Sequence, residues 1–162
     1  MRLKNRLLAM LLLVCMIFSM LPAVALTASA ADVTIASWGK VSLAKDNPVS
    51  AATYEGTTAP TMTSDKAITS AGSDNHCYYG DAGGATITIS GLPSGYTTKK
   101  ITFYTRASSQ GVMNVSISTD GGTTYTNVGS ASITKKVLLK TVTLSKPVEN
   151  VTNIKFEHDK SG

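Results

Sequence analysis

The stretch V-M-N-V-S-I-S-T-D-G-G, from Val112 to Gly122, indicates the fold class of this chain. Apolar and polar side chains alternate from Met113 to Ser118. That alternation places Met113, Val115 and Ile117 on one face of an extended strand. The Asp-Gly-Gly sequence that follows is typical of a tight turn. The stretch therefore predicts a half-buried β-strand that ends in a hairpin turn.

Five other segments alternate in the same way and predict further strands: 33–38, 85–90, 100–106, 137–145 and 152–158. The region 40–81 is polar and rich in small residues, and it predicts long loops and short edge strands. Leu138 is expected on the same side of its strand as Val142 and Leu144. The alternation predicts a core that includes Ile87, Ile89, Ile101, Phe103, Val115, Ile117, Val142, Leu144, Ile154 and Phe156.

Turn residues separate these segments, and no segment has a sustained helical period. Gly83-Gly84, 91–95 and 145–147 are examples of such breakers. Several short strands at regular spacing are typical of an all-β domain, either a sandwich or a barrel.

The first 30 residues predict a cleaved signal peptide, expected to be helical, that precedes a single domain over 31–162. Arg2, Lys4 and Arg6 give a positive start, residues 7–18 are apolar, and Ala28-Ser29-Ala30 provides small residues for cleavage after Ala30. This order is characteristic of secretion leaders, and a retained membrane anchor is the alternative. The product is expected to be secreted or displayed on the cell surface. Membrane contact is expected only through the leader before cleavage.

Charge and cysteine content narrow the choice of partners. The net charge is +5, but three of the 15 basic residues lie in the leader. Lys99-Lys100 and Lys135-Lys136 are scattered pairs, so no nucleic-acid patch is evident. Cleavage would remove Cys15 and leave Cys77 alone, as a buried thiol, a reactive thiol or half of an intermolecular pair.

No arrangement of residues predicts catalysis, a metal site or a cofactor. Asp74, His76, Cys77 and Asp81 are metal-ligand types, but a transition-metal site needs three or four ligands held in shape. His158 could join them only through the fold. There is no nucleophile elbow and no paired carboxylate. The chain is therefore expected not to be an enzyme.

The segment Ser118–Tyr125 resembles the Asp-box, S-x-D-x-G-x-T-W, with Tyr125 in place of Trp. In such a turn the Asp side chain accepts backbone N–H bonds, and glycine supplies positive φ. Propellers of the sialidase type repeat this box on several blades, whereas it occurs once here. Asp120, Gly121 and Gly122 are therefore predicted to stabilise a hairpin.

Exposed aromatic side chains are the candidate ligand contacts, because they combine a flat apolar ring with a polar group. Tyr54, Tyr104 and the outward-pointing member of the pair Tyr78-Tyr79 are predicted to stack on a glycan or another cell-surface polymer. Trp38 is expected to be buried.

Three features together resemble an accessory β-sandwich domain at the N-terminus of some secreted bacterial proteins. They are an early strand ending in Trp38, the stretch K-I-T-F-Y-T-R-A-S-S from Lys100, and N-V-S-I-S-T-D-G-G-T-T-Y-T-N-V-G from Asn114. The family includes endonuclease/exonuclease/phosphatase-type enzymes and multidomain surface proteins. The resemblance implies an antiparallel, jelly-roll-like β-sandwich that is non-catalytic and compared with carbohydrate-binding modules.

The resemblance leaves three functions open. The first is an extracellular binding or structural module for carbohydrate or another polymer. The second is the N-terminal accessory part of a larger secreted hydrolase of the nuclease or phosphatase type. The third is a surface protein that self-associates through an open strand edge. The sequence stops at Gly162 where the family continues into its closing strand, which predicts a C-terminal truncation or a different closure.

Overall fold

The computed structural model describes residues 31–38, 42–70, 77–79, 85–105 and 110–159, with the backbone alone for 68–70 and 77–79. The chain divides into two compact units, Met1–Val33 and Thr34–Gly162, and the second carries every described strand. The expected leader, 1–30, lies outside the described residues.

The described residues form strands and no helix, which confirms the all-β prediction. No described segment is a helix with the length and hydropathy to cross a bilayer. The strands are β1 (Ala36–Ser37), β2 (Val49–Ser50), β3 (Thr53–Tyr54), β4 (Thr61–Ser64), β5 (Ile68–Ser70), β6 (Cys77–Tyr79), β7 (Thr86–Ser90), β8 (Thr97–Thr105), β9 (Gly111–Ser118), β10 (Thr126–Ile133), β11 (Leu138–Glu149) and β12 (Asn153–Asp159).

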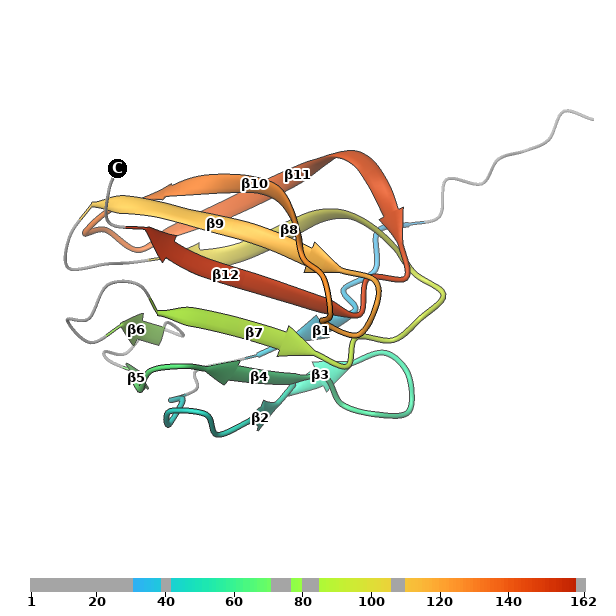
Figure 1. Ribbon diagram of the computed structural model, residues 1–162, viewed down its shortest axis with the longest axis horizontal. Coiled ribbons are helices and arrows are strands. Elements are labelled where there is room, and N and C mark those ends of the chain that lie inside the picture. The colour runs from blue at the N-terminus through green and yellow to red at the C-terminus, as the bar shows by residue number, and fades with distance from the viewer. Residues whose placement is uncertain (1–30, 39–41, 71–76, 80–84, 106–109, 160–162) are drawn as a thin grey trace, which may run out of the picture. The chain divides into compact units, whose positions relative to one another are not determined.

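Neighbouring strands pair in antiparallel fashion throughout (Figure 1). The largest sheet has six strands in the order β10-β9-β12-β7-β4-β2. Three two-stranded sheets, β11-β8, β1-β3 and β5-β6, complete the described strands. Strand β9 sits next to both β10 and β12, so the stretch that begins at Gly111 lies inside the largest sheet.

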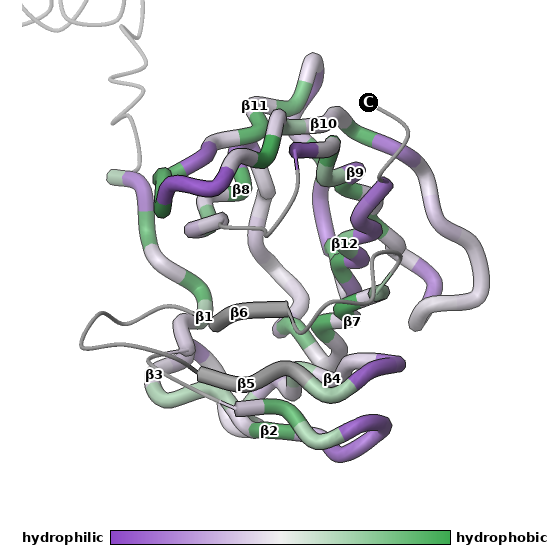
Figure 2. The backbone as a smooth tube through the Cα atoms, turned by 90° about the vertical axis from the view of Figure 1, so that its left-hand side faces the viewer, coloured by the Kyte–Doolittle hydropathy of each residue, from purple (hydrophilic) through white to green (hydrophobic). Residues whose placement is uncertain are grey.

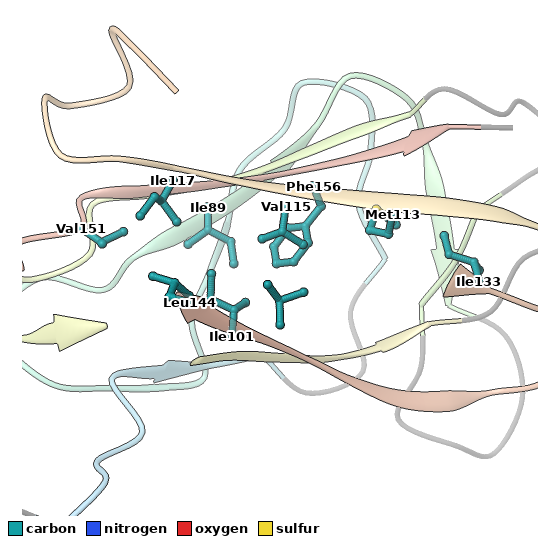
Figure 3. Packing of buried hydrophobic residues seen from close by; sticks show 10 residues of the cluster. Ile89, Ile101, Met113, Val115, Ile117, Ile133, Leu144, Val151 and Phe156 are labelled. Atoms are coloured by element: carbon teal, nitrogen blue, oxygen red, sulfur yellow. The ribbon is translucent and has the colours of Figure 1, made fainter. Parts of the chain in front are cut away.

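The apolar core lies between the six-stranded sheet and the β8–β11 pair. Figure 2, turned by 90° from Figure 1, shows β8 and β11 on one side and β9, β12 and β7 on the other. Figure 3 shows side chains of both layers meeting. The buried cluster consists of Ile89, Ile101, Met113, Val115, Ile117, Ile133, Val142, Leu144, Val151 and Phe156.

Two aromatic rings join the layers directly. Phe103 of β8 and Phe156 of β12 meet with ring centroids 4.9 Å apart and ring planes inclined by 65°. This edge-to-face geometry directs the positive edge of one ring at the negative face of the other. Phe156 is 7% exposed, and Phe103 is half-buried. The contact therefore sets which faces of β8 and β12 look inward.

The predicted core agrees well with the observed one. Seven of the ten predicted residues are buried, and the other three, Ile87, Phe103 and Ile154, are half-buried against the same cluster. Each comes from a run with period two. The alternation of side chains along a strand therefore identified the inward face correctly in β7, β8, β9 and β12.

Leu138 lies on the same side of β11 as Val142, as expected, because the register of β11 against β8 is unbroken between them. It is nevertheless 38% exposed. Leu138 begins β11 and pairs with Thr105, the last residue of β8. Both strands end there, so the side chain is covered from fewer directions than Val142 in mid-strand.

No alternating run marks β10 in the sequence beyond the predicted hairpin turn, and the first strand is shorter than predicted. Strand β10 has mostly polar or small residues, and its register shifts between Asn127 and Gly129, which breaks the period of two. The run predicted over 33–38 forms only the two-residue β1. Trp38, expected to be buried, is half-buried, and its indole N–H donates to the Val49 carbonyl at 3.1 Å. The short strands expected within 40–81 occur, but β4 lies inside the sheet between β7 and β2.

The contact between Phe103 and Phe156 gives a test of the layer arrangement. Phe156→Ala should lower the free energy of unfolding by about 3–5 kcal/mol, the usual cost of removing a buried aromatic side chain. Phe103→Ala should cost less, because Phe103 is only half-buried. Urea denaturation measures both, with Tyr104→Ala as an exposed control on the same strand. A loss below about 1 kcal/mol for Phe156→Ala would contradict the core assignment.

Candidate functional site

The Asp120 turn is closed by several hydrogen bonds to one carboxylate. Both carboxylate oxygens of Asp120 accept the N–H of Thr124, at 3.0 and 3.1 Å, and Oδ2 accepts the Thr124 hydroxyl at 2.6 Å. Oδ1 also accepts the N–H of Thr123 at 3.1 Å and the hydroxyl of Ser118 at 2.6 Å. One carboxylate thus satisfies donors from three residues around the turn.

The turn is also fastened to the neighbouring connection between β11 and β12. Thr152 donates its N–H to the Ser118 carbonyl at 2.8 Å, and its hydroxyl accepts the N–H of Gly121 at 3.0 Å. Ser118 Oγ accepts the N–H of Gly122 at 2.9 Å. Because these contacts cross between two connections, they hold the turn against the body of the domain as well as closing it.

Positive backbone angles explain the two glycines. Gly121 has φ +75° and Gly122 has φ +91°, a region that residues with a Cβ rarely adopt. A Cβ on Gly122 would also lie 3.1 Å from Asn153 Nδ2 and 3.2 Å from the Tyr125 hydroxyl. Gly122 therefore allows the turn to approach β12 closely.

The hydrogen bonds have an electrostatic consequence. The Ser118 hydroxyl, followed by the hydroxyl and N–H of Thr124, holds the pKa of Asp120 far below its usual range, because each bond favours the ionised carboxylate. Asp120 is therefore ionised near neutral pH, with its oxygens occupied by donors of its own turn. This geometry gives the carboxylate a local structural role. That it takes no part in ligand binding stays a prediction.

Tyr125 closes the turn and lies against β12. The Lys155 ammonium is 4.8 Å from the centroid of the Tyr125 ring, and it pairs with Glu157 at 3.2 Å. A cation over a ring face is attracted by the ring quadrupole. No sequence pattern indicated this lysine, which lies 30 positions further along the chain than Tyr125.

Tyr104 is well exposed on the outward face of the β8–β11 pair. Its side chain is 58% exposed, and that of its register partner Leu139 is 55% exposed. The next outward pair is Thr102 and Thr141, whose hydroxyls lie 3.2 Å apart. A ring, an apolar side chain and hydroxyls therefore lie together on one strand pair. Sequence reasoning missed Leu139, because only the register of β11 against β8 places it beside Tyr104.

The other candidate tyrosines lie on other sheets. Tyr54 is 43% exposed on β3, which pairs with β1. Tyr78 and Tyr79 belong to β6, which pairs with β5, and their side chains lie outside the described part of the chain. The described contacts bring none of these residues together with Tyr104.

The possible metal ligands are largely outside the described part as well. Asp74, His76 and Asp81 belong there, and Cys77 is described by its backbone alone. His158 is buried at 7% exposure on β12, in register with Met113. Within the described ranges, no group of three or more His, Cys, Asp or Glu side chains could hold a metal ion.

No family model, curated protein or solved structure matches this chain.

The lowered pKa of Asp120 predicts an acid-dependent loss of stability. A carboxyl with a lowered pKa in the folded state stabilises the fold above the pKa of the unfolded state, about 3.9 for Asp. This contribution diminishes as pH falls from about 4 toward the lowered value. Asp120→Asn should therefore melt below the wild type at pH 7, by a modest amount because the carboxylate is exposed, and the gap should narrow between about pH 4 and pH 2.

Melting curves followed by circular dichroism measure this gap. Asp46→Asn is the matched control, since Asp46 is likewise an exposed carboxyl in a turn. The positive φ of the Asp46 turn is that of Asp46 itself, whereas near Asp120 it is that of the two glycines. An equal gap between wild type and Asp120→Asn at pH 3 and pH 7 would show that the carboxylate charge does not stabilise the turn.

Proposed function

We propose that residues 31–162 form a non-catalytic extracellular binding module, a jelly-roll-like β-sandwich that contacts a glycan or another cell-surface polymer. The observation that supports it best is the outward face of the β8–β11 pair. There, Tyr104 and Leu139 are each more than half exposed beside the hydroxyls of Thr102 and Thr141. A sugar ring has apolar C–H faces and a rim of hydroxyls, so a flat ring next to polar side chains suits it.

The module's scaffold supports this use of the face. Tyr104 alternates with Phe103 and Thr105, which point inward and are half-buried and buried respectively. A strand held by its inward residues presents its outward ring without ordering a loop, so little conformational entropy is lost on binding. The tyrosine ring itself has few rotatable bonds, which keeps this cost low.

Export of the module is part of the proposal. The leader should be removed after Ala30, because a positive start, an apolar run and small residues precede that bond. N-terminal sequencing of the exported protein should begin within about two residues of Ala31. Ala30→Arg should impair this processing, since the cleavage site requires a small residue. Recovery of an intact Met1 end on the exported wild type would contradict cleavage.

The binding role is tested on Tyr104. Tyr104→Ala should weaken binding about tenfold to whichever polysaccharide slows the wild type in the gel, which corresponds to about 1.4 kcal/mol of binding free energy. Tyr104→Phe keeps the ring and should bind within about twofold of the wild type. Affinity electrophoresis in gels with cellulose derivatives, mannan, chitin derivatives or polygalacturonate measures this, with melting curves as the folding control. Wild-type protein that none of these polymers retards would contradict the proposed function.

A further inference from the structure

We infer that the open edge of β8 accepts one extended strand of another polypeptide, with apolar side chains at alternate positions and an acidic side chain beside Lys99. This edge, named the β8 edge, is the side of the strand that faces away from β11. The partner is a polypeptide, so the inference goes beyond the proposed glycan site and does not depend on it.

Strand β8 is paired along one side. Among the described residues it pairs with β11 and with no other strand. The backbone hydrogen bonds described outside the strand pairs involve other segments of the chain. Alternate residues of a strand direct their N–H and C=O groups to opposite sides, so the β8 edge offers a row of these groups to a further strand.

The β8 edge is also the longest regular edge among the described sheets. Strand β8 has nine residues and pairs without a register shift from Lys100 to Thr105. Strands β1, β2, β3, β5 and β6 have only two or three residues each. Strand β10 has a register shift between Asn127 and Gly129, and β11 contains Pro147 within its own shift. Short length, bulges and proline protect an edge from pairing, and the β8 edge has none of them.

The side chains beneath the β8 edge are apolar and incompletely covered. Phe103 points inward from β8 and is half-buried, and so is Trp38, which follows β1. Both pack against the core cluster. Figure 2 shows β1 on the same side of the core as β8. A strand beside β8 would therefore bury further apolar surface if its inward side chains were apolar, which requires them at alternate positions.

A single segment fits the β8 edge better than a second copy of the chain. If β8 paired with β8 of a second copy, that copy's β11 would occupy the following position in the layer. On this side of the core, β1 and its partner β3 follow β8 (Figure 2). A folded two-stranded layer would meet them, whereas one extended segment needs only the position next to β8. Addition of such a segment to a sheet edge is a common mode of peptide recognition.

The charge of β8 specifies the partner further. The strand contains Lys99 and Lys100 and no acidic residue, and Lys99 is exposed. Opposite charges on neighbouring strands attract, and like charges directly opposite each other repel. A carboxylate at the end of the added strand that lies beside Lys99 therefore favours binding, and an ammonium group there opposes it.

The experiment measures amide hydrogen exchange of the exported chain with a synthetic peptide of nine residues, the length of β8. The peptide has glutamate at both ends, with valine, isoleucine and valine alternating with threonine between them. At up to about 1 mM peptide, one alternating set of amides between residues 101 and 105 should exchange about tenfold more slowly. The amides of β10, whose edge is bulged, should be unaffected. A peptide of the same composition with its three apolar residues consecutive should give no protection.

A charge exchange tests the role of Lys99. A second peptide with lysine in place of both glutamates should bind the wild type roughly threefold more weakly than the first. Lys99→Glu should reverse this preference. Lys45→Glu changes an exposed lysine outside β8 in the same way and should leave the preference as in the wild type.

Each contrary result overturns a stated part of the inference. Unchanged exchange at residues 101–105 overturns the strand site, and equal protection by the peptide with consecutive apolar residues overturns the alternating pattern. An unaltered preference in Lys99→Glu overturns the role of the charge. A dimer in sedimentation velocity, with the same amides protected in the absence of peptide, would assign the β8 edge to a second copy. None of these measurements uses a polysaccharide, so the proposed function and this inference can fail separately.

Discussion

The contact between Phe103 and Phe156 is the constraint on which the two layers depend. It joins β8 to β12, strands of different sheets, through rings whose centroids are 4.9 Å apart. Because side chains alternate along a strand, directing these two residues inward directs their neighbours outward. The same contact therefore places Tyr104 on one outer surface and Lys155 on the other. Burial of the surrounding aliphatic residues, such as Ile89 and Leu144, stabilises this arrangement over one with the opposite faces of the strands turned inward.

The outward faces differ in chemistry although both are set by the same core. The β8–β11 pair presents a ring and an aliphatic side chain to solvent, whereas the outward side of the six-stranded sheet carries mostly hydroxyls and amides, with the ion pair between Lys155 and Glu157 among them. A two-stranded layer leaves its outward side chains open on both flanks. In the wider sheet, each inner strand has a neighbour on both sides, so short side chains such as Ser116 become buried on the outward face too. Sheet width thus accounts for much of the difference in exposure.

The Asp120 turn shows how local chemistry and tertiary contacts combine. The carboxylate gathers donors from Ser118, Thr123 and Thr124, all within four residues. These hydrogen bonds of the carboxylate follow from the Asp-box pattern, because each partner lies at a fixed short spacing from Asp120. The bonds to Thr152 and the approach of Gly122 to Asn153 join residues about 30 positions apart. No local pattern indicates them, and they connect the turn to the start of β12.

The sequence by itself determined the all-β class, five of the long strands, most of the core and the bonding of the Asp120 turn. These follow from period-two alternation and from turn residues at short spacing, which are local properties. Only the tertiary structure decided the strand order, the exposure of Leu138, the extent and bulge of β10 and the pairing of Tyr104 with Leu139. Each depends on which strands lie side by side and where they end. Pairing between distant segments sets those properties. The alternation along one segment does not indicate which segment pairs with it.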